Sequence, residues 1–162
     1  MRLPPALAAA LDLVPIPHPF DLGVYLQRVE QARGRRLHIH ELPAAATGAI
    51  CGLWVATENA DHIFIASGAV GLLYTNIVLH EISHMLLDHG KVGGDAAAAL
   101  ARLLRGGEEV QRAAARSRYD TTEEREAERL ATLILMRSGE PDEPDDRDGL
   151  FMLGRIMGYH RR

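Results

Sequence analysis

The sequence predicts one α+β domain in which helices pack on a short, twisted, mainly antiparallel sheet. Its 162 residues, of which 47% are hydrophobic and 25% charged, suit a single soluble domain with its own core, spanning residues 1–162. Apolar residues recur at helical spacing within residues 21–33, 72–89 and 121–136, whereas β-rich alternation is confined to residues 36–66. Neither internal repeats nor a boundary to a second domain is evident.

The first third of the chain predicts a lead-in, a helix and a strand. Residues 1–19 are expected to be extended, because prolines interrupt residues 15–19. Asp21 is expected to cap a helix that runs to about Arg33, and Gly34 to end it. Residues 36–42 then alternate apolar and polar side chains, as a half-buried strand does. His38 and His40 share one face of this strand, for which a solvated surface is favoured over a second metal site.

A hairpin and a long apolar helix follow. Residues 50–57 and 62–66 are β-rich and are separated by a polar turn, which indicates a hairpin. Apolar residues at helical spacing, without an interrupting Gly or Pro, predict a helix over residues 72–89. It contains the pattern H-E-x-x-H, as His80-Glu81-Ile82-Ser83-His84. Two histidines one helical turn apart can reach one metal ion, and the glutamate beside them can activate water. This context favours a catalytic zinc site over a chance pattern.

The remainder of the chain predicts an insert, a helix and an acidic loop. Residues 90–120 are expected to be a flexible or helical insert. Thr121 and Glu124 fit a capping box at the start of the next helix. Its buried stripe is expected to consist of Ala127, Leu130, Ala131, Ile134 and Leu135. An acidic loop over residues 139–149 and a short amphipathic helix over residues 150–159 are expected to close the chain.

The third ligand of the zinc site must come from another part of the chain, because a catalytic zinc usually takes three protein ligands and leaves one position open. His89 is set aside, because on a continuous helix it is turned about 140° away from His84. Glu126 is favoured, since it lies beside the apolar stripe, and periodicity does not exclude Glu123. Glu124 and Glu128 are exposed alternatives. Candidates for stabilising an oxyanion are Tyr74, Tyr119 and His89, which the sequence does not rank.

Charge and cysteine content limit the functional classes. A formal net charge of -4 gives no reason to expect direct binding of nucleic acid. Cys51 is the sole cysteine, so an intrachain disulfide is excluded, and a small core residue is favoured over a nucleophile. No apolar stretch is long enough to span a bilayer, and the N-terminal apolar run is too short for a targeting signal. The expected location is the cytoplasm.

Two motifs together resemble a known family. His80-Glu81-Ile82-Ser83-His84, followed by Glu124-Arg125-Glu126-Ala127-Glu128-Arg129-Leu130-Ala131, resembles the ImmA/IrrE family of bacterial zinc metallopeptidases, which pairs H-E-x-x-H with a later E-x-E-A-N-x-F-A helix. The resemblance implies a zincin-like fold, zinc held by His80, His84 and Glu126, and Glu81 as the general base. It also implies a protein substrate, a helix-turn-helix transcriptional repressor, in stress responses, toxin–antitoxin systems or mobile elements. The chain departs from the family pattern at Glu128, Leu130 and Arg137.

Three functional hypotheses follow from the sequence. The favoured one is a zinc-dependent endopeptidase that cleaves a regulatory protein. The alternative is a non-hydrolytic zincin-like module that senses zinc or sequesters a repressor. The third is a purely structural zinc site, which would need a fourth protein ligand to close the coordination sphere.

Overall fold

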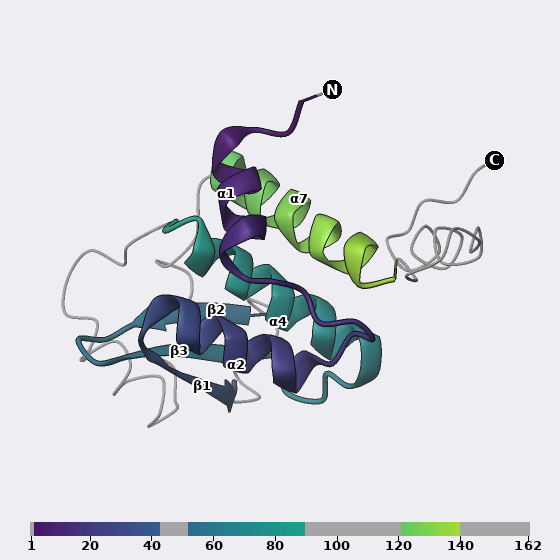
Figure 1. The fold of residues 1–162 in the computed structure, drawn as a ribbon. Helices are drawn as coiled ribbons and strands as arrows, with labels where there is room; N and C mark the ends of the chain where they lie inside the picture. Colours follow the sequence, from purple (N-terminus) through teal and green to yellow (C-terminus); the bar gives the residue numbers. More distant parts are fainter. Residues whose placement is uncertain (1, 43–51, 90–120, 140–162) are drawn as a thin grey trace.

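The chain folds into helices and a small sheet in the order α1, α2, β1, β2, β3, α4, α7 (Figure 1). The structure is a computed structural model, and it describes residues 2–42, 52–89 and 121–139. The elements are α1 (Pro5–Leu13), α2 (Leu22–Arg33), β1 (Arg36–Glu41), β2 (Gly52–Ala56), β3 (Ala60–Ile65), α4 (Gly71–Leu86) and α7 (Thr121–Ser138). The α+β class is therefore confirmed.

The extended lead-in expected over residues 1–19 is wrong, because it contains helix α1. Proline is tolerated in the first turn of a helix, where its missing N–H would have no intrahelical partner, and α1 begins at Pro5. The core-facing side chains follow the helical spacing i, i+3, i+4 and i+7 and are Leu7, Ala10, Leu11 and Val14. This spacing was the signal in the sequence, and the prolines among residues 15–19 interrupt the chain only after the helix has ended.

Helix α2 has the predicted boundaries. The Asp21 carboxylate accepts a hydrogen bond of 2.8 Å from the Val24 N–H, which caps the helix. Gly34 ends it in the left-handed conformation, with a φ of 63°. Tyr25 and Val29 are buried and place one face of α2 in the core.

The sheet has three strands among the described residues, in the order β1-β3-β2. The predicted hairpin is confirmed: β2 and β3 are antiparallel, with Trp54 opposite Ile63. However, β1 lies on the far side of β3 and runs parallel to it, so the sheet is mixed rather than mainly antiparallel. A hairpin links only β2 and β3. Strands β1 and β2 are consecutive in the chain but are separated in the sheet by β3, an order that no local pattern reports.

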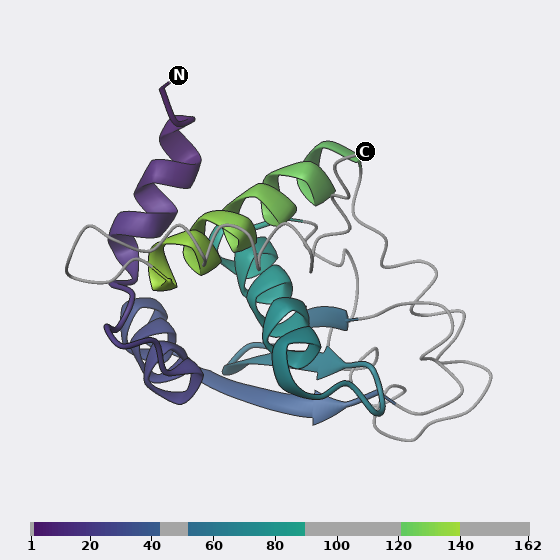
Figure 2. The same cartoon turned by 90° about the vertical axis from the view of Figure 1, so that its right-hand side faces the viewer.

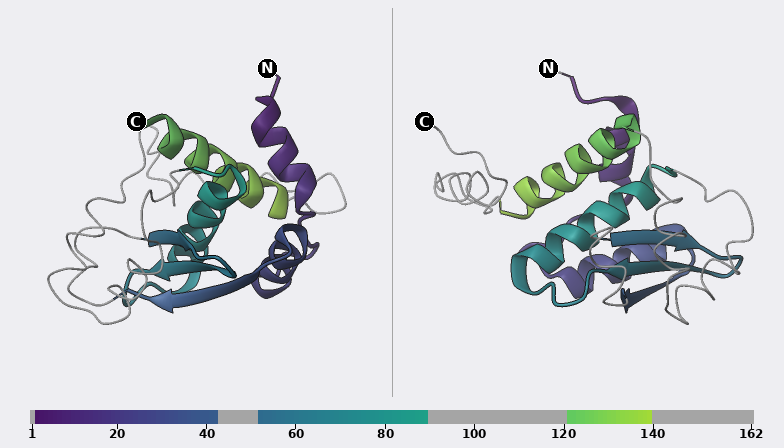
Figure 3. Two further views of the ribbon diagram at one scale, coloured as in Figure 1. Left: turned by 90° about the vertical axis from the view of Figure 1, so that its left-hand side faces the viewer. Right: turned by 180° about the vertical axis from the view of Figure 1, so that it is seen from behind.

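Helix α4 lies between the sheet and α7 (Figures 2 and 3). One sheet face, which carries Trp54, Ile63 and Ile65, joins the core with the apolar side of α4. Helix α7 packs on α4 through the predicted stripe, all five members of which are buried: Ala127, Leu130, Ala131, Ile134 and Leu135. Helix α1 contacts α7. The apolar residues of α4 from Ile77 to Met85 are thus buried between sheet and helices, which holds the polar residues of this part of the helix at a fixed position.

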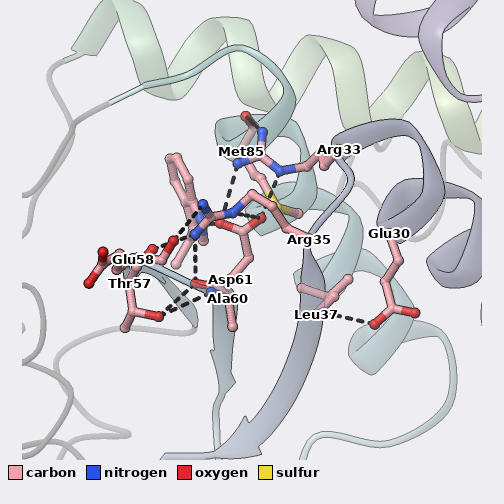
Figure 4. A network of polar contacts seen from close by, with 10 residues as sticks. Glu30, Arg33, Arg35, Leu37, Thr57, Glu58, Ala60, Asp61 and Met85 are labelled. Carbon is pink, nitrogen blue, oxygen red and sulfur yellow. Dashed lines mark hydrogen bonds and ion pairs between the residues drawn. The ribbon is translucent and has the colours of Figure 1, made fainter.

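A buried carboxylate ties α2, the sheet and the end of α4 together (Figure 4). Asp61 on β3 is 1% exposed and accepts hydrogen bonds from the Arg33 Nε at 2.7 Å and the Trp54 Nε1 at 3.1 Å. Arg33 also donates to the Met85 carbonyl oxygen at 3.2 Å, near the C-terminus of α4. Arg35 adds an ion pair to Asp61 and donates to the carbonyl oxygens of the β2–β3 turn. This network fixes the end of α4 relative to the strands.

Several expectations fall on residues that the structure does not describe. They are the 90–120 insert, most of the acidic loop over residues 139–149, the helix over residues 150–159, Cys51 and Tyr119. Within the described ranges, no helix is long and apolar enough to cross a membrane.

Candidate metal centre

Two histidines of α4 and one glutamate of α7 form a candidate metal-binding group. The spacing of four residues places His80 and His84 one turn apart, and their Nε2 atoms lie 3.1 Å from each other. The Glu124 carboxylate approaches both, at 3.1 Å from the His80 Nε2 and 3.5 Å from the His84 Nε2. All three ligand atoms lie within 4.8 Å of one another. Two imidazoles and a carboxylate are a common donor set for Zn²⁺ and related ions.

The third member of the group is Glu124, not the Glu126 that the sequence favoured. The Glu126 carboxylate lies 3.0 Å from the His89 Nε2 instead, and Glu123 and Glu128 are also outside the group. Glu126 was expected as the ligand because it is close to the apolar stripe in sequence. That stripe shows which side of α7 is buried, but which turn of α7 lies over His80 depends on how the two helices cross.

The group is buried on one side and open on the other. The His84 side chain is fully buried, whereas the side chains of His80 and Glu124 are 27% and 46% exposed. Burial, together with the neighbouring His80 and His89, lowers the pKa of His84 to about 3, so this ring is neutral at physiological pH. A neutral imidazole is the form that binds a metal ion. Among the described residues the group offers three ligand atoms and an exposed side.

Glu81 lies beneath β2, beside the histidines. It is 3% exposed, and it accepts a hydrogen bond from the backbone N–H of Trp54. Burial raises its pKa to about 8, and the negative charge of Glu124 acts in the same direction. Its Oε2 atom is buried and finds no hydrogen-bond partner among the described residues. An unpaired buried oxygen beside three converging ligand atoms fits a site that is completed by a bound group.

Gly52 makes room for the Glu81 carboxylate, a role that was not predicted from the sequence. A Cβ atom at residue 52 would lie 2.7 Å from the Glu81 Oε1 and 2.8 Å from the Ile77 Cγ2. The strand therefore approaches α4 through a residue without a side chain. A glycine inside a β-rich run was the available signal, because it often marks a close backbone approach.

His89 lies against His84, although a continuous helix was expected to direct it away from His84. Helix α4 ends at Leu86, and Asp88 adopts a positive φ of 54°. This turn lets the His89 N–H donate to the His84 carbonyl oxygen at 2.9 Å, and the two Nδ1 atoms lie 3.1 Å apart. The expected rotation of about 140° assumed a continuous helix. We call His80, His84 and His89 the α4 histidine cluster.

A cavity of about 270 Å³ opens next to His80 and Glu81, between α4 and α7. Its apolar wall consists of Ile77, Ala131 and Leu135. Asn76, Glu128 and Thr132 add polar groups to the lining. The cavity is large enough for an amino-acid side chain and shares two residues with the candidate site.

Three other histidines gather on the opposite face of the sheet. His38 and His40 on β1 lie beside His62 on β3, and we call them the sheet histidine cluster. The His40 Nε2 lies 2.9 Å from the His62 Nδ1, and the two rings are stacked at an interplanar angle of 17°. No set of three potential ligand atoms converges here among the described residues. The predicted shared face of His38 and His40 is confirmed, and His62 is its third member.

Comparisons of the chain with protein-family models, with curated proteins and with solved structures give no match.

Proposed function

We propose that the protein is a zinc-dependent endopeptidase with a zincin-like fold. The observation that carries the proposal is the convergence of His80, His84 and Glu124 beside a buried, incompletely bonded Glu81. Two histidines and a glutamate with an exposed side are typical of catalytic zinc sites, whereas structural sites are closed by four protein ligands. Zinc held in this way supplies Lewis acidity, which activates water and polarises a carbonyl group.

Glu81 is the proton carrier in the proposed reaction. Its carboxylate takes a proton from the attacking water and returns it to the amine that leaves when the peptide bond breaks. Burial raises its pKa to about 8, and a group with a pKa near the working pH can both accept and release a proton. The Trp54 N–H donates a hydrogen bond that positions the carboxylate beneath β2, and the missing side chain at Gly52 leaves the space for it.

The surroundings of the site suit an extended peptide. Strand β2 pairs with β3 on one side, and no other described strand pairs with its second edge. An extended chain can add to such an edge through main-chain hydrogen bonds. The neighbouring cavity, lined by Ile77, Ala131 and Leu135, can then accept a side chain close to the bond that is cleaved.

The substrate is proposed to be a regulatory protein, in particular a helix-turn-helix repressor. This part rests on the resemblance of His80–His84 and of the α7 motif to the ImmA/IrrE family. It also rests on the cavity and on the β2 edge that pairs with no other described strand, which would receive a peptide. The test is to incubate the zinc-loaded protein with a helix-turn-helix protein encoded beside its gene, with and without a chelator. We expect fragments of defined mass that appear only without the chelator.

Glu81→Gln separates catalysis from binding. Because Glu81 is outside the ligand group, the variant should bind one zinc ion as the wild type does and lose cleavage by about 100-fold or more, the usual contribution of a general base. The matched control is Glu58→Gln, which removes the same charge at an exposed turn. Equal cleavage by wild type and Glu81→Gln would remove Glu81 from the mechanism. Tight repressor binding without cleavage by the zinc-loaded wild type would favour the non-hydrolytic module.

A further inference from the structure

We propose that His89 and Glu126 are positioning residues that fix the tautomer of His84, so that its Nε2 presents a lone pair to the metal ion. They form a chain of contacts behind the ligand: the Glu126 carboxylate lies 3.0 Å from the His89 Nε2, and the His89 Nδ1 lies 3.1 Å from the His84 Nδ1. The inference rests on His84 as a metal ligand but not on peptide hydrolysis.

With both rings neutral, the chemistry of these contacts allows one consistent placement of the protons. The Glu126 carboxylate can only accept, so the His89 Nε2 must carry the hydrogen. A neutral His89 then presents an unprotonated Nδ1, which accepts the hydrogen from the His84 Nδ1. With its hydrogen on Nδ1, His84 has a lone pair on Nε2, the atom that lies near His80 and Glu124. Metal-binding histidines generally donate their second N–H in this way.

Burial gives this arrangement its specificity. His84 is 0% exposed and His89 is 6% exposed, so water has little access to either ring. In such surroundings an unmatched donor or acceptor costs about 1–3 kcal/mol, which favours the tautomer that satisfies both rings. The positive φ of Asp88 and the bond from the His89 N–H to the His84 carbonyl oxygen hold His89 against His84. Glu126, at 45% side-chain exposure, closes the chain at the surface.

The first experiment reads the tautomers in the metal-free protein by ¹H–¹⁵N NMR of the imidazole rings. In the wild type we expect the hydrogen on Nδ1 of His84 and on Nε2 of His89. In Glu126→Gln the amide can either accept from or donate to the His89 Nε2, so the single preference should be lost and part of the His84 population should carry its hydrogen on Nε2. The control Glu128→Gln removes the same charge from the same helix and should leave both tautomers unchanged. A wild-type His84 with its hydrogen on Nε2 would overturn the proposal.

The second experiment measures zinc affinity by competition with a chelator. Glu126→Gln and His89→Ala should each weaken binding by about 10–100-fold, the usual effect of losing an outer partner of a ligand. The double variant should be no weaker than His89→Ala alone, because both residues act through one chain of contacts. Additive losses of zinc affinity in the double variant, or no loss in either single variant, would overturn the proposed chain of contacts.

A third measurement distinguishes a positioning role from direct ligation by Glu126. The visible spectrum of the cobalt-substituted protein reports the coordination sphere. Glu126→Gln should retain the wild-type spectrum once saturated with cobalt, whereas Glu124→Gln should change it while leaving the His84 tautomer as in the wild type. A changed spectrum in Glu126→Gln would indicate that Glu126 is itself a ligand and would refute the positioning role. Because no readout is cleavage, a failure here is distinct from a failure of the proposed peptidase activity.

Discussion

The two histidine clusters are alike in composition and different in what surrounds them. In each, two ring nitrogens lie about as far apart as two ligands of one metal ion: 3.1 Å between His80 and His84, and 2.9 Å between His40 and His62. In the α4 histidine cluster the rings meet edge to face, and two carboxylates of α7 complete the contacts. In the sheet histidine cluster the rings are stacked, and no third ligand atom converges on them among the described residues.

This difference teaches that proximity of imidazoles does not by itself make a metal centre. The α4 cluster has a carboxylate on the proposed metal side, from Glu124, and another behind it, from Glu126. In the proposed site, the first carboxylate supplies a ligand and the second orders a proton. In the sheet histidine cluster His62 stacks on His38 and His40, and only two ring nitrogens, those of His40 and His62, come close; no third ligand atom joins them among the described residues.

The largest expected effect is on the free energy of unfolding, and it compares two adjacent residues of β3 that face opposite sides of the sheet. Asp61→Ala leaves the buried side of Arg33 without its partner and should lower the free energy of unfolding by about 3–5 kcal/mol. His62→Ala, in the sheet histidine cluster, should lower it by about 1 kcal/mol or less. Urea unfolding of both variants in the presence of a chelator measures the contrast. Similar losses would mean that the two faces of β3 contribute equally to stability.

Zinc affinity tests the clusters directly. Glu124→Ala removes one of three ligands and should weaken zinc binding by about 1,000-fold, since about 10–16 kcal/mol of zinc-binding energy shared among three ligands gives about 3–5 kcal/mol for each. His62→Ala and His40→Ala should retain the wild-type affinity and a stoichiometry of one. Chelator competition and calorimetry provide the values. A second zinc equivalent that His62→Ala abolishes would contradict the distinction between the clusters.

Gly52 tests how closely the sheet approaches the α4 side of the molecule. Gly52→Ala would force its Cβ atom against the Glu81 carboxylate and Ile77, at 2.7 and 2.8 Å, and should destabilise the fold by about 1–3 kcal/mol. It should also displace Glu81 and reduce cleavage. Ala56→Ser, at the exposed end of the same strand, should change stability by about 0.5 kcal/mol or less. Thermal unfolding of the two variants decides, and an unperturbed Gly52→Ala would show that β2 can move away from α4.

The smallest expected effect is the pH dependence of the sheet histidine cluster. Burial, and the positive charges of neighbouring histidines, lower the pKa of His40 and His62 below 6.5. The unfolded chain therefore binds more protons than the folded one, and stability decreases as the pH falls through about 6.5. The double variant His40→Gln, His62→Gln should flatten this decrease by a few tenths of a kcal/mol, because solvent screens half-exposed groups. Unfolding free energies between about pH 5 and 8 measure the difference, and an unchanged slope would exclude the effect.

The sequence by itself determined the elements whose pattern is local. The capped helix from Asp21 to Gly34, the hairpin around residues 57–60 and the buried stripe of α7 each follow from residues close together in the chain, and the structure confirms them. The same holds for His80 and His84, because helical spacing alone places them one turn apart. The spacing of Leu7, Ala10 and Leu11 would have predicted helix α1, but the prolines that follow led to the prediction of an extended segment.

Tertiary structure decided everything that joins distant parts of the chain. The parallel pairing of β1 with β3 joins strands that are not consecutive in the chain. Whether Glu124 or Glu126 lies beside His80 and His84 depends on how α7 crosses α4. Helix α4 ends at Leu86, and the positive φ of Asp88 then places His89 against His84. Glu126 therefore contacts His89. Local periodicity states which side of a helix is buried. It does not state which turn of that helix meets a particular side chain, and here that crossing separates the proposed ligand from the proposed positioning residue.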